Sequence, residues 1–456
     1  MDPFVGMRKQ HITAKKSIVI LILGIIFLTQ MLPLVVAQDA KKFGSNIKVN
    51  RKSQEYSDQV EPTMAILSTG RILVGWKEAE EHRGPGKRVG FAYSDNDGAK
   101  FSDYILMEQL VSTETFTQSD PWLVADSDDN VYFVFLQADG GHHVKGDIAA
   151  AKTTDGGTSW LPAVNCSDTS SFDDKETATI DSEGNLYVAW TGPLREIRFT
   201  RSTDGGQSFI PTKLLASNKF HGYIHASPND TLYHTNTIVG GSDFNEIELI
   251  KSINQGDTWT TPVTIVAPSS ALVSRITVID TDSDENVYIV YAKGTEDDKE
   301  IYIVKSANAG QTWSTPVQVN DVSTGDQRMP EMFIGQNDVI HIAWLDARIE
   351  GKQHYYYCYS TDGGVTFSES EQVTERGFDK DFTRPGDYFC MRQAPNGDMC
   401  MVWTDGRNGE DHDIYFARQG LIKMPVWGWI TIAGGSVIII ATTVVILVLK
   451  RKRVTQ

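Results

Sequence analysis

The sequence contains few cysteines, and its basic residues are outnumbered by its acidic ones. Four cysteines in 456 residues cannot form the dense disulfide framework of a small secreted domain. We expect Cys390 and Cys400 to be buried free thiols, because simple pairing about Asn396-Gly397 puts them on opposite faces of one hairpin. The formal net charge of −17 argues against nucleic acid or an anionic lipid surface as a general partner, although local basic sites remain open.

Motifs for a metal, a nucleotide or a cofactor are also missing. His142 and His143 form a pair without the further spaced ligands that a zinc site needs. Acidic segments such as 181–185 and 282–286 lack the ligand spacing and closing glutamate of a calcium loop, so we interpret them as hairpin turns. No glycine-rich phosphate loop follows a strand and opens a helix. We therefore expect neither a cofactor nor a metal.

Long charge-free runs are confined to the two ends of the chain. Basic residues precede an apolar run over 17–37, and Val35-Val36-Ala37 suits cleavage by signal peptidase. The 24 uncharged residues of 426–449 are enough to span a bilayer, and the basic residues that follow would stay on the cytoplasmic side. We predict a single-pass cell-membrane protein composed of a signal peptide at 1–37, an extracellular domain at 38–423, a transmembrane helix at 424–449 and a cytoplasmic tail at 450–456.

The strongest positive feature is an eight-residue repeat at intervals of about 50 residues, a period typical of propellers and solenoids. Its pattern is Ser/Thr-x-Asp/Asn-x-Gly-x-x-Trp/Phe, which describes a tight hairpin. The carboxylate or amide accepts hydrogen bonds from backbone N–H groups of its own turn, the glycine permits positive φ, and the aromatic side chain packs as an apolar plug. Six copies occur, at 94–101, 153–160, 202–209, 252–259, 306–313 and 360–367.

These copies resemble the Asp-box, or BNR repeat, of sialidases and related propellers. The resemblance implies an all-β propeller and says little about function. Seven second strands can be read from the sequence, one more than the boxes, and the last unit has neither a box nor a fourth strand. We predict a seven-bladed propeller in which the spare strand 46–50 completes the last blade, whereas sialidases have six blades.

Function is expected where the first strands begin, because these strands line the central channel. Counting back about 15 residues from each second-strand aromatic reaches a ring of mostly ionisable residues. A solvated, salt-bridged rim is the alternative interpretation of this ring. The ring consists of Glu61, Asp120, Lys175 beside Glu176, His221, Arg275, Arg328 and Asp387–Tyr388, with Arg384 just before Asp387.

The order of residue types is similar to that of sialidases, which grip a sugar carboxylate with three arginines. The resemblance implies that Asp120 is the acid/base, Tyr388 the nucleophile and Glu176 its activator. Arg275 and Arg328 match two of the arginines. The first arginine of the family is replaced by Glu61, so Arg384 would have to take the third place.

Two copies of Trp-x-Asp-x-Arg leave adjacent blades on the same face, at 344–348 and 403–407. A tryptophan plane beside a fixed Asp–Arg pair could bind sugar by stacking and hydrogen bonds. The same residues could equally form an internal salt bridge that braces a loop. The side chains concerned are Trp344, Asp346, Arg348, Trp403, Asp405 and Arg407.

We hypothesise that the domain recognises a carbohydrate or another surface ligand, including an acidic one, at the mouth that bears Arg275, Arg328 and Arg384. One alternative is an exo-glycosidase of sialidase type that uses Asp120, Glu176 and Tyr388. A second alternative is a structural surface protein that presents its loops to partner proteins.

Overall fold

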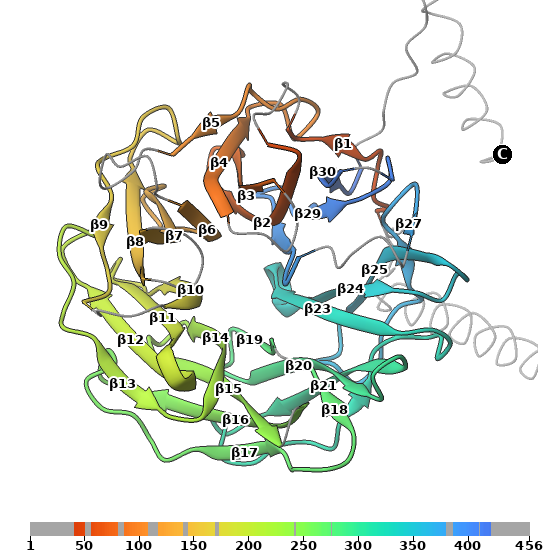
Figure 1. Ribbon diagram of the computed structural model, residues 1–456. Helices are drawn as coiled ribbons and strands as arrows, with labels where there is room; N and C mark the ends of the chain where they lie inside the picture. The colour runs from red at the N-terminus through yellow and green to blue at the C-terminus, as the bar shows by residue number, and fades with distance from the viewer. Residues whose placement is uncertain are drawn as a thin grey trace, which may run out of the picture. The chain divides into compact units, whose positions relative to one another are not determined.

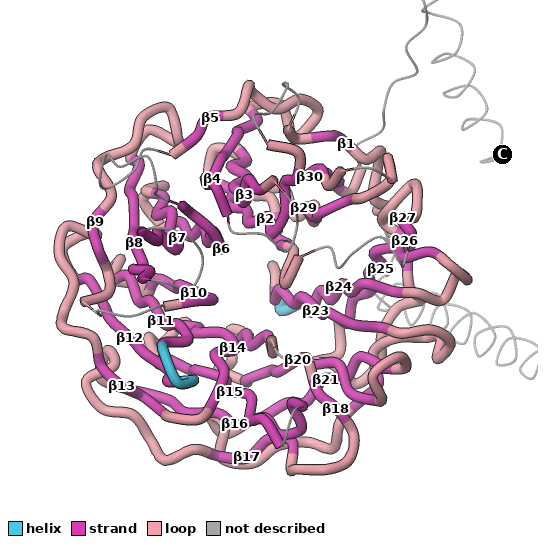
Figure 2. The backbone as a smooth tube through the Cα atoms, viewed as in Figure 1, coloured by secondary structure: helices cyan, strands magenta, loops and turns pink. Residues whose placement is uncertain are grey.

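The computed structural model describes residues 41–50, 56–80, 86–107, 117–139, 145–168, 173–240, 243–274, 276–379, 386–409 and 411–420. These residues form seven antiparallel sheets, set radially around a central axis (Figure 1). Apart from two short 3₁₀ turns, the regular structure is all strand (Figure 2). The predicted all-β, seven-bladed propeller is thereby confirmed.

Each of the first four blades is a four-stranded meander that runs from the channel to the outer edge. Blade 1 consists of β2 (Asp58–Ile66), β3 (Ile72–Ala79), β4 (Gly86–Ser94) and β5 (Ile105–Leu106). Blade 2 consists of β6 (Thr117–Ala125), β7 (Val131–Asp139), β8 (Lys145–Thr153) and β9 (Val164–Asn165). Blade 3 consists of β10 (Asp174–Ile180), β11 (Leu186–Gly192), η1 (Pro193–Arg195), β12 (Glu196–Ser202) and β13 (Lys213–Ala216). Blade 4 consists of β14 (Lys219–Ala226), β15 (Leu232–Gly240), β16 (Asp243–Ser252) and β17 (Val263–Val266).

The last three blades vary this plan. Blade 5 divides its first strand into β18 (Leu272–Val273) and β19 (Val278–Thr281), followed by β20 (Val287–Gly294), β21 (Lys299–Ser306) and β22 (Val317–Gln318). Blade 6 consists of β23 (Gln327–Ile334), η2 (Gln336–Asp338), β24 (Ile340–Asp346), β25 (Lys352–Ser360), β26 (Glu371–Gln372) and the added β27 (Phe378–Asp379). Blade 7 consists of β28 (Cys390–Gln393), β29 (Met399–Asp405), β30 (Asp413–Arg418) and, from the other end of the chain, β1 (Ile47–Lys48).

The second strand of each blade forms the core. Every residue of β3, β11, β24 and β29 is buried. Both faces of a blade are covered by its neighbours, so these strands are nearly continuous apolar runs instead of alternating ones. Their tryptophans, Trp76, Trp190, Trp344 and Trp403, have no exposed surface.

The repeated turns have the hydrogen bonds that their sequence predicts. In blade 3, Asp204 Oδ1 accepts the N–H groups of Gln207 and Ser208 at 3.0 and 2.9 Å. Ser202 Oγ accepts the N–H of Gly206 at 2.9 Å. Burial opposes ionisation of Asp204, but hydrogen bonds from Ser208, Ser202 and Gln207 together outweigh it and lower the pKa to about 2. The acid is therefore a fixed acceptor that shapes its own turn.

Each turn also packs on the preceding blade. The box aromatics Trp160 and Phe101 meet Phe91 and Phe416 of the preceding third strands at 5.1 and 5.3 Å between ring centroids. A Cβ on Gly98, at φ +81°, would lie 2.0 Å from Phe416. Glycine is therefore needed there both for the positive φ and for the close approach between blades.

The acidic segments at 181–185 and 282–286 are hairpin turns, as predicted. Asp181 Oδ1 accepts the N–H groups of Glu183 and Asn185 at 3.0 and 2.8 Å. The turns also join neighbouring blades, because Ser182 N donates to Asp230 Oδ1 at 2.8 Å. They therefore act as structural contacts between blades.

The N-terminal strand completes blade 7, which confirms the prediction for residues 46–50. Ile47 pairs with Phe416 and Lys48 with Tyr415, antiparallel to β30. Asn50 has no exposed surface, and its Oδ1 accepts the N–H of Ile414 at 2.9 Å. The two ends of the propeller are thus joined by one sheet, which leaves no open strand edge at the closure.

All four cysteines lie in the described part of the chain, and all four are buried and unpaired. The free thiols predicted at Cys390 and Cys400 are therefore confirmed. The predicted signal peptide at 1–37 and transmembrane helix at 424–449 lie outside the described residues. Among the residues that are described, no helix is long and apolar enough to cross a bilayer.

Removing residues 38–52 should leave the edge of β30 bare. We expect a lower melting temperature and aggregation through the unpaired edge, measured by calorimetry and size-exclusion chromatography. Asn50→Ala should lower the free energy of unfolding by about 1–3 kcal/mol, the cost of unsatisfied buried partners. The exposed Asn165→Ala is the control and should change little. A truncated protein that stays monomeric with an unchanged melting temperature would refute the closure.

Candidate functional site

The channel mouth is built by bulges in the first strands. The pairing register shifts after Val60 in β2, Ser119 in β6 and Asp174 in β10. The next residues, Glu61, Asp120 and Lys175, have φ of 56°, 48° and 58°. A left-handed conformation at a residue other than glycine costs free energy, and such strain concentrates at functional sites.

Lys175 is the central cation of this mouth. Its Nζ lies 3.0 Å from Asp120 Oδ1, 2.9 Å from Asp387 Oδ2 and 3.7 Å from Glu61 Oε1. Lys77 Nζ lies 3.7 Å from the other oxygen of Glu61. Four blades therefore contribute to one buried charge cluster, in which three carboxyl groups surround one ammonium.

The cluster separates the pKa values of its acids. Burial raises the pKa of Asp120, but the ammonium of Lys175, a hydrogen bond with Glu61 and the charge of Lys77 together outweigh burial and hold that pKa well below its ordinary value. Burial dominates at Glu61, and the pKa there is raised although Lys175 and Lys77 oppose it. One acid is thus ionised while its neighbour is biased toward the protonated form.

Glu176 differs from these acids because neither of its carboxyl oxygens has a hydrogen-bond partner in another residue. Its side chain is buried, and burial, reinforced by the charge of Asp120, raises its pKa well above the ordinary value. Glu176 lines a small cavity of about 10 Å³ with Trp122, Tyr223 and Tyr388. A buried carboxyl group without a protein partner is available to a ligand.

A second cavity of about 60 Å³ shares Tyr223, Ile276 and Tyr388 with the first. Together they are the channel-mouth cavities. The larger has room for only a few water molecules. A ligand would therefore place a substituent in the cavity and hold the rest of its body above the mouth.

Tyrosines line these cavities in two different ways. Tyr388 donates its hydroxyl proton to the carbonyl of Pro121 at 3.1 Å. Tyr223 donates to Glu331 Oε2 at 2.9 Å. Burial raises the pKa of Glu331 to about 7, although the nearby Arg392 opposes this shift. Tyr223–Glu331 is therefore the hydrogen-bonded tyrosine–glutamate pair of the mouth.

The residue count along the sequence did not select Tyr223 or Glu331. The residue count reached His221 and Arg328, two and three positions too early, because a bulge changes which side chains face the channel. A tyrosine or acid just after the counted position was the available signal. Predicted Asp120, Glu176 and Tyr388 do meet at the mouth, but Tyr388 contacts a carbonyl instead of Glu176.

The predicted arginine site is only partly visible. Arg328 is half-buried, and its guanidinium lies 3.5 Å from Asp326 Oδ2. Arg275 and Arg384 lie outside the described residues, as does the side chain of His221. Recognition of an acidic group by these arginines stays a prediction.

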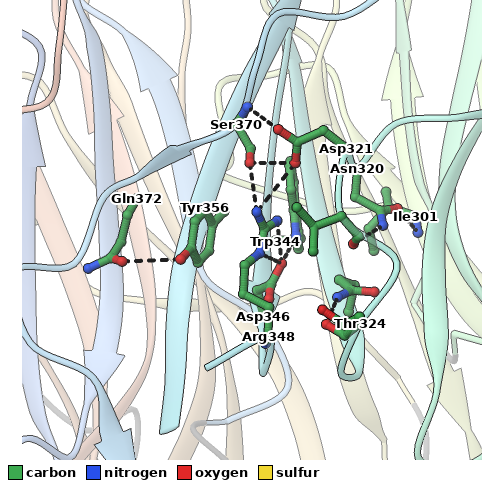
Figure 3. Close-up of polar contacts among 12 residues, drawn as sticks. Ile301, Asn320, Asp321, Thr324, Trp344, Asp346, Arg348, Tyr356, Ser370 and Gln372 are labelled. Carbon is green, nitrogen blue, oxygen red and sulfur yellow. Dashed lines mark hydrogen bonds and ion pairs between the residues drawn. The ribbon is translucent and has the colours of Figure 1, made fainter. Parts of the chain in front are cut away.

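The Trp-x-Asp-x-Arg motif forms an internal brace (Figure 3). Asp346 Oδ2 accepts Trp344 Nε1 at 2.8 Å and Arg348 Nη2 at 2.7 Å. The guanidinium lies 3.9 Å from the centre of the Tyr356 ring. Because Trp344 is fully buried, its ring cannot stack on a sugar in this conformation. The geometry corresponds to the salt-bridge interpretation.

The blade 7 copy is built the same way, with Asp405 accepting Trp403 Nε1 at 2.8 Å and Arg407 Nε at 2.8 Å. A third version, missed in the sequence, has glutamate in place of aspartate. Trp76 Nε1 donates to Glu78 Oε1 at 2.6 Å. Because this Trp–acid contact recurs in three blades, we interpret it as structural. The candidate ligand site is therefore the channel mouth and not these motifs.

Lys175→Met should remove the cation that three carboxyl groups share. We expect the free energy of unfolding near pH 7 to fall by about 3–5 kcal/mol, as for other broken buried ion pairs. In the variant, burial and mutual repulsion raise the folded-state pKa values, so the lost stability returns as the pH falls below the unfolded-state values. In the wild type the pH dependence has the opposite sign, because the pKa of Asp120 is lowered by folding. The ionised Asp120 stabilises the folded state above the ordinary pKa of an aspartate, and this stabilisation is lost on acidification.

Denaturant unfolding at pH 7 and pH 4 measures this difference. The exposed Lys100→Met is the matched control and should alter neither value. An equal loss for Lys175→Met at both pH values would contradict the shared-cation arrangement.

No protein-family model and no curated protein matches this sequence. A Dyadobacter fermentans protein of unknown function aligns with TM-score 0.54 at 12% identity, over 83% of this chain and 98% of that one. A PL25 ulvan lyase bound to -[GlcA(1-4)Rha3S]- aligns with TM-score 0.55 at 12% identity, over 82% and 95%. A Hadza microbial sialidase, Hz136, aligns with a TM-score of 0.48 at 13% identity, over 72% of this chain and 68% of that one. At these identities, the two closer likenesses show that the chain shares a propeller fold with proteins that include a polysaccharide lyase.

Proposed function

We propose that this propeller binds a carbohydrate at its channel mouth. The observation that carries the proposal is Glu176, a buried carboxyl group without a hydrogen-bond partner beside Tyr223 and Tyr388. Hydroxyl groups of a sugar can donate to and accept from such a group, and tyrosines provide both apolar faces and polar tips. The likeness in fold to a polysaccharide lyase bound to -[GlcA(1-4)Rha3S]- supports a carbohydrate as the ligand.

The local charge favours a neutral sugar group in the cavity over an acidic one. Asp120, Asp387 and Glu61 surround Lys175, so the described mouth has no cation that is not already neutralised. A ligand carboxylate would meet like charges at short range. The acidic sugar of the sialidase hypothesis would instead depend on Arg275 and Arg384.

A second candidate function is cleavage of the bound sugar. Glu176 has a raised pKa and the neighbouring Asp120 a lowered one. Two acids whose pKa values are pushed apart are typical of general acid–base pairs. The arrangement favours Glu176 as proton donor and keeps Asp120 ionised, whereas the sialidase resemblance implied Asp120 as the acid/base.

Variants of Glu176 separate binding from cleavage. Glu176→Gln keeps the shape and a hydrogen-bonding group but has no acidic proton. Glu176→Leu has neither a hydrogen-bonding group nor an acidic proton. We expect both variants to lose at least about 100-fold in turnover of 4-methylumbelliferyl glycosides, a loss typical of removing a general acid. Only Glu176→Leu should lose glycan-array binding. An array without hits would refute the binding proposal, and wild-type binding without turnover would refute cleavage alone.

We further propose that the chain is anchored in the cell membrane with the propeller outside. The supporting pattern is the uncharged run at 426–449, followed by four basic residues at 450–453. Protease added to intact cells should degrade the propeller and spare an epitope placed after Gln456. An epitope accessible on unpermeabilised cells would reverse the orientation.

A further inference from the structure

Each repeated turn packs on the second or third strand of the preceding blade. In blade 3, a Cβ on Gly206 would lie 3.1 Å from the ring of Tyr132 in blade 2. On blade 2, Lys152 is paired with Tyr132 across β7 and β8, and its Nζ lies 4.9 Å from the ring centre. The equivalent lysine of blade 4, Lys251, donates to the carbonyl of Ala309 in the next turn at 2.7 Å. In blades 2 to 5 a tyrosine paired with a lysine or arginine thus forms a socket for the next turn, whereas blade 1 pairs Leu73 with Tyr93 and places Arg71 over that ring.

Blade 7 has no such turn to place on blade 6. Its third strand, β30, is followed by Gln419, and its fourth strand comes from the other end of the chain. Phe43 replaces the missing aromatic, because its ring meets Tyr357 of blade 6 at 5.1 Å and 77°. The Trp160–Phe91 contact has nearly the same geometry, 5.1 Å and 73°. Within the described residues, no repeated turn of blade 7 brings a glycine onto blade 6.

The result is a cleft of about 290 Å³ between blades 6 and 7, which we call the blade-7 cleft. It lies at the turn end of the propeller, away from the channel mouth, because the first strands of both blades finish there. Its size is close to the lower end of the range for small-molecule pockets. The lining includes Asn337, His341, Tyr357, Tyr359, Thr361 and Gln393.

The socket residues differ in blade 6. His341 and Tyr359 are paired across β24 and β25, at the positions where blades 2 and 5 carry Tyr132–Lys152 and Tyr288–Lys305. The lysine that holds a turn is therefore replaced by a tyrosine. A cleft adapted to a peptide turn would be expected to keep the cation that binds its carbonyl groups.

His341 is 94% buried, and its Nε2 has no hydrogen-bond partner. Its Nδ1 lies 2.6 Å from the hydroxyl of Tyr357, which fixes the orientation of the ring. Burial lowers the pKa of His341 to about 4, so the ring is neutral near pH 7. An unsatisfied imidazole nitrogen in a cleft wall indicates a position for a ligand group.

The charges of the cleft are already compensated. Lys41, at its edge, forms an ion pair with Asp398. Apart from Val339 and Gly397, the other lining residues provide amides, hydroxyls, aromatic rings and the neutral imidazole. Such a wall offers both donors and acceptors and has no net charge, which suits an uncharged ligand with many hydroxyl groups.

We infer that the blade-7 cleft is a binding site for a neutral carbohydrate, separate from the channel mouth. His341 Nε2, the Tyr359 hydroxyl and the Thr361 hydroxyl provide its hydrogen bonds, and the tyrosine rings provide apolar faces. The inference does not depend on the function proposed for the mouth.

Saturation-transfer NMR on the purified full-length chain tests this site with lactose, maltose and cellobiose as probes. The detergent must lack a sugar head group. We expect saturation transfer to at least one probe in the wild type. His341→Tyr and Tyr359→Lys restore the residues of the covered sockets, so they should fold normally and weaken binding about three- to tenfold each, the loss expected for one hydrogen bond.

Thr361→Val should weaken binding to a similar extent, and Thr203→Val is its matched control. Thr203 is exposed at the same position of the blade 3 turn and should leave affinity unchanged. The absence of transfer to all three probes would overturn the inference. Transfer that survives His341→Tyr/Tyr359→Lys but disappears in Glu176→Leu would also overturn it, because the sugar would then lie at the mouth.

Discussion

The architecture depends on the carboxylate or amide that folds each repeated turn. Asp362, like Asp155 and Asp204, accepts backbone N–H groups of the two turn residues that precede the aromatic position, and the asparagine copies accept one of the two. These bonds set a conformation in which a glycine with positive φ approaches the preceding blade directly. The hydrogen bonds within each turn thereby allow that turn to pack against the preceding blade. Because the same turn occurs in six of seven blades, the ring repeats one packing solution with small variations.

The channel mouth uses a different principle, in which strain and burial are concentrated on a few charged residues. Backbone bulges bring Glu61, Asp120 and Lys175 from three blades into one cluster. Such a cluster is costly unless each charge is paired, and Lys175 is the shared partner. Glu176 is the exception, and its raised pKa is the physical consequence of burial without a partner. This contrast is why the mouth is the favoured place for ligand chemistry.

The closure of the ring breaks its symmetry at one place. Joining β1 to β30 requires that the chain ends occupy the position of a seventh repeated turn. Phe43 preserves the aromatic contact, while the lost glycine turn leaves the blade-7 cleft. The change from a Tyr–Lys pair to His341–Tyr359 occurs in the blade that faces this opening. A functional difference between the two ends of the propeller thus follows from how the ring is closed.

The sequence by itself determined the repeated turns, the seven blades, the closing strand and the free thiols. These features depend on turn chemistry within eight residues and on short apolar strand runs, which are local properties. The mouth was only partly predictable: Asp120, Glu176 and Tyr388 were found, but Lys175 as shared cation and Tyr223–Glu331 as the hydrogen-bonded pair were not. Bulges shift the register by one residue, and no local pattern marks them. Only the tertiary structure decided that Asp346 and Asp405 brace buried tryptophans, because burial depends on the neighbouring blades and not on the motif itself.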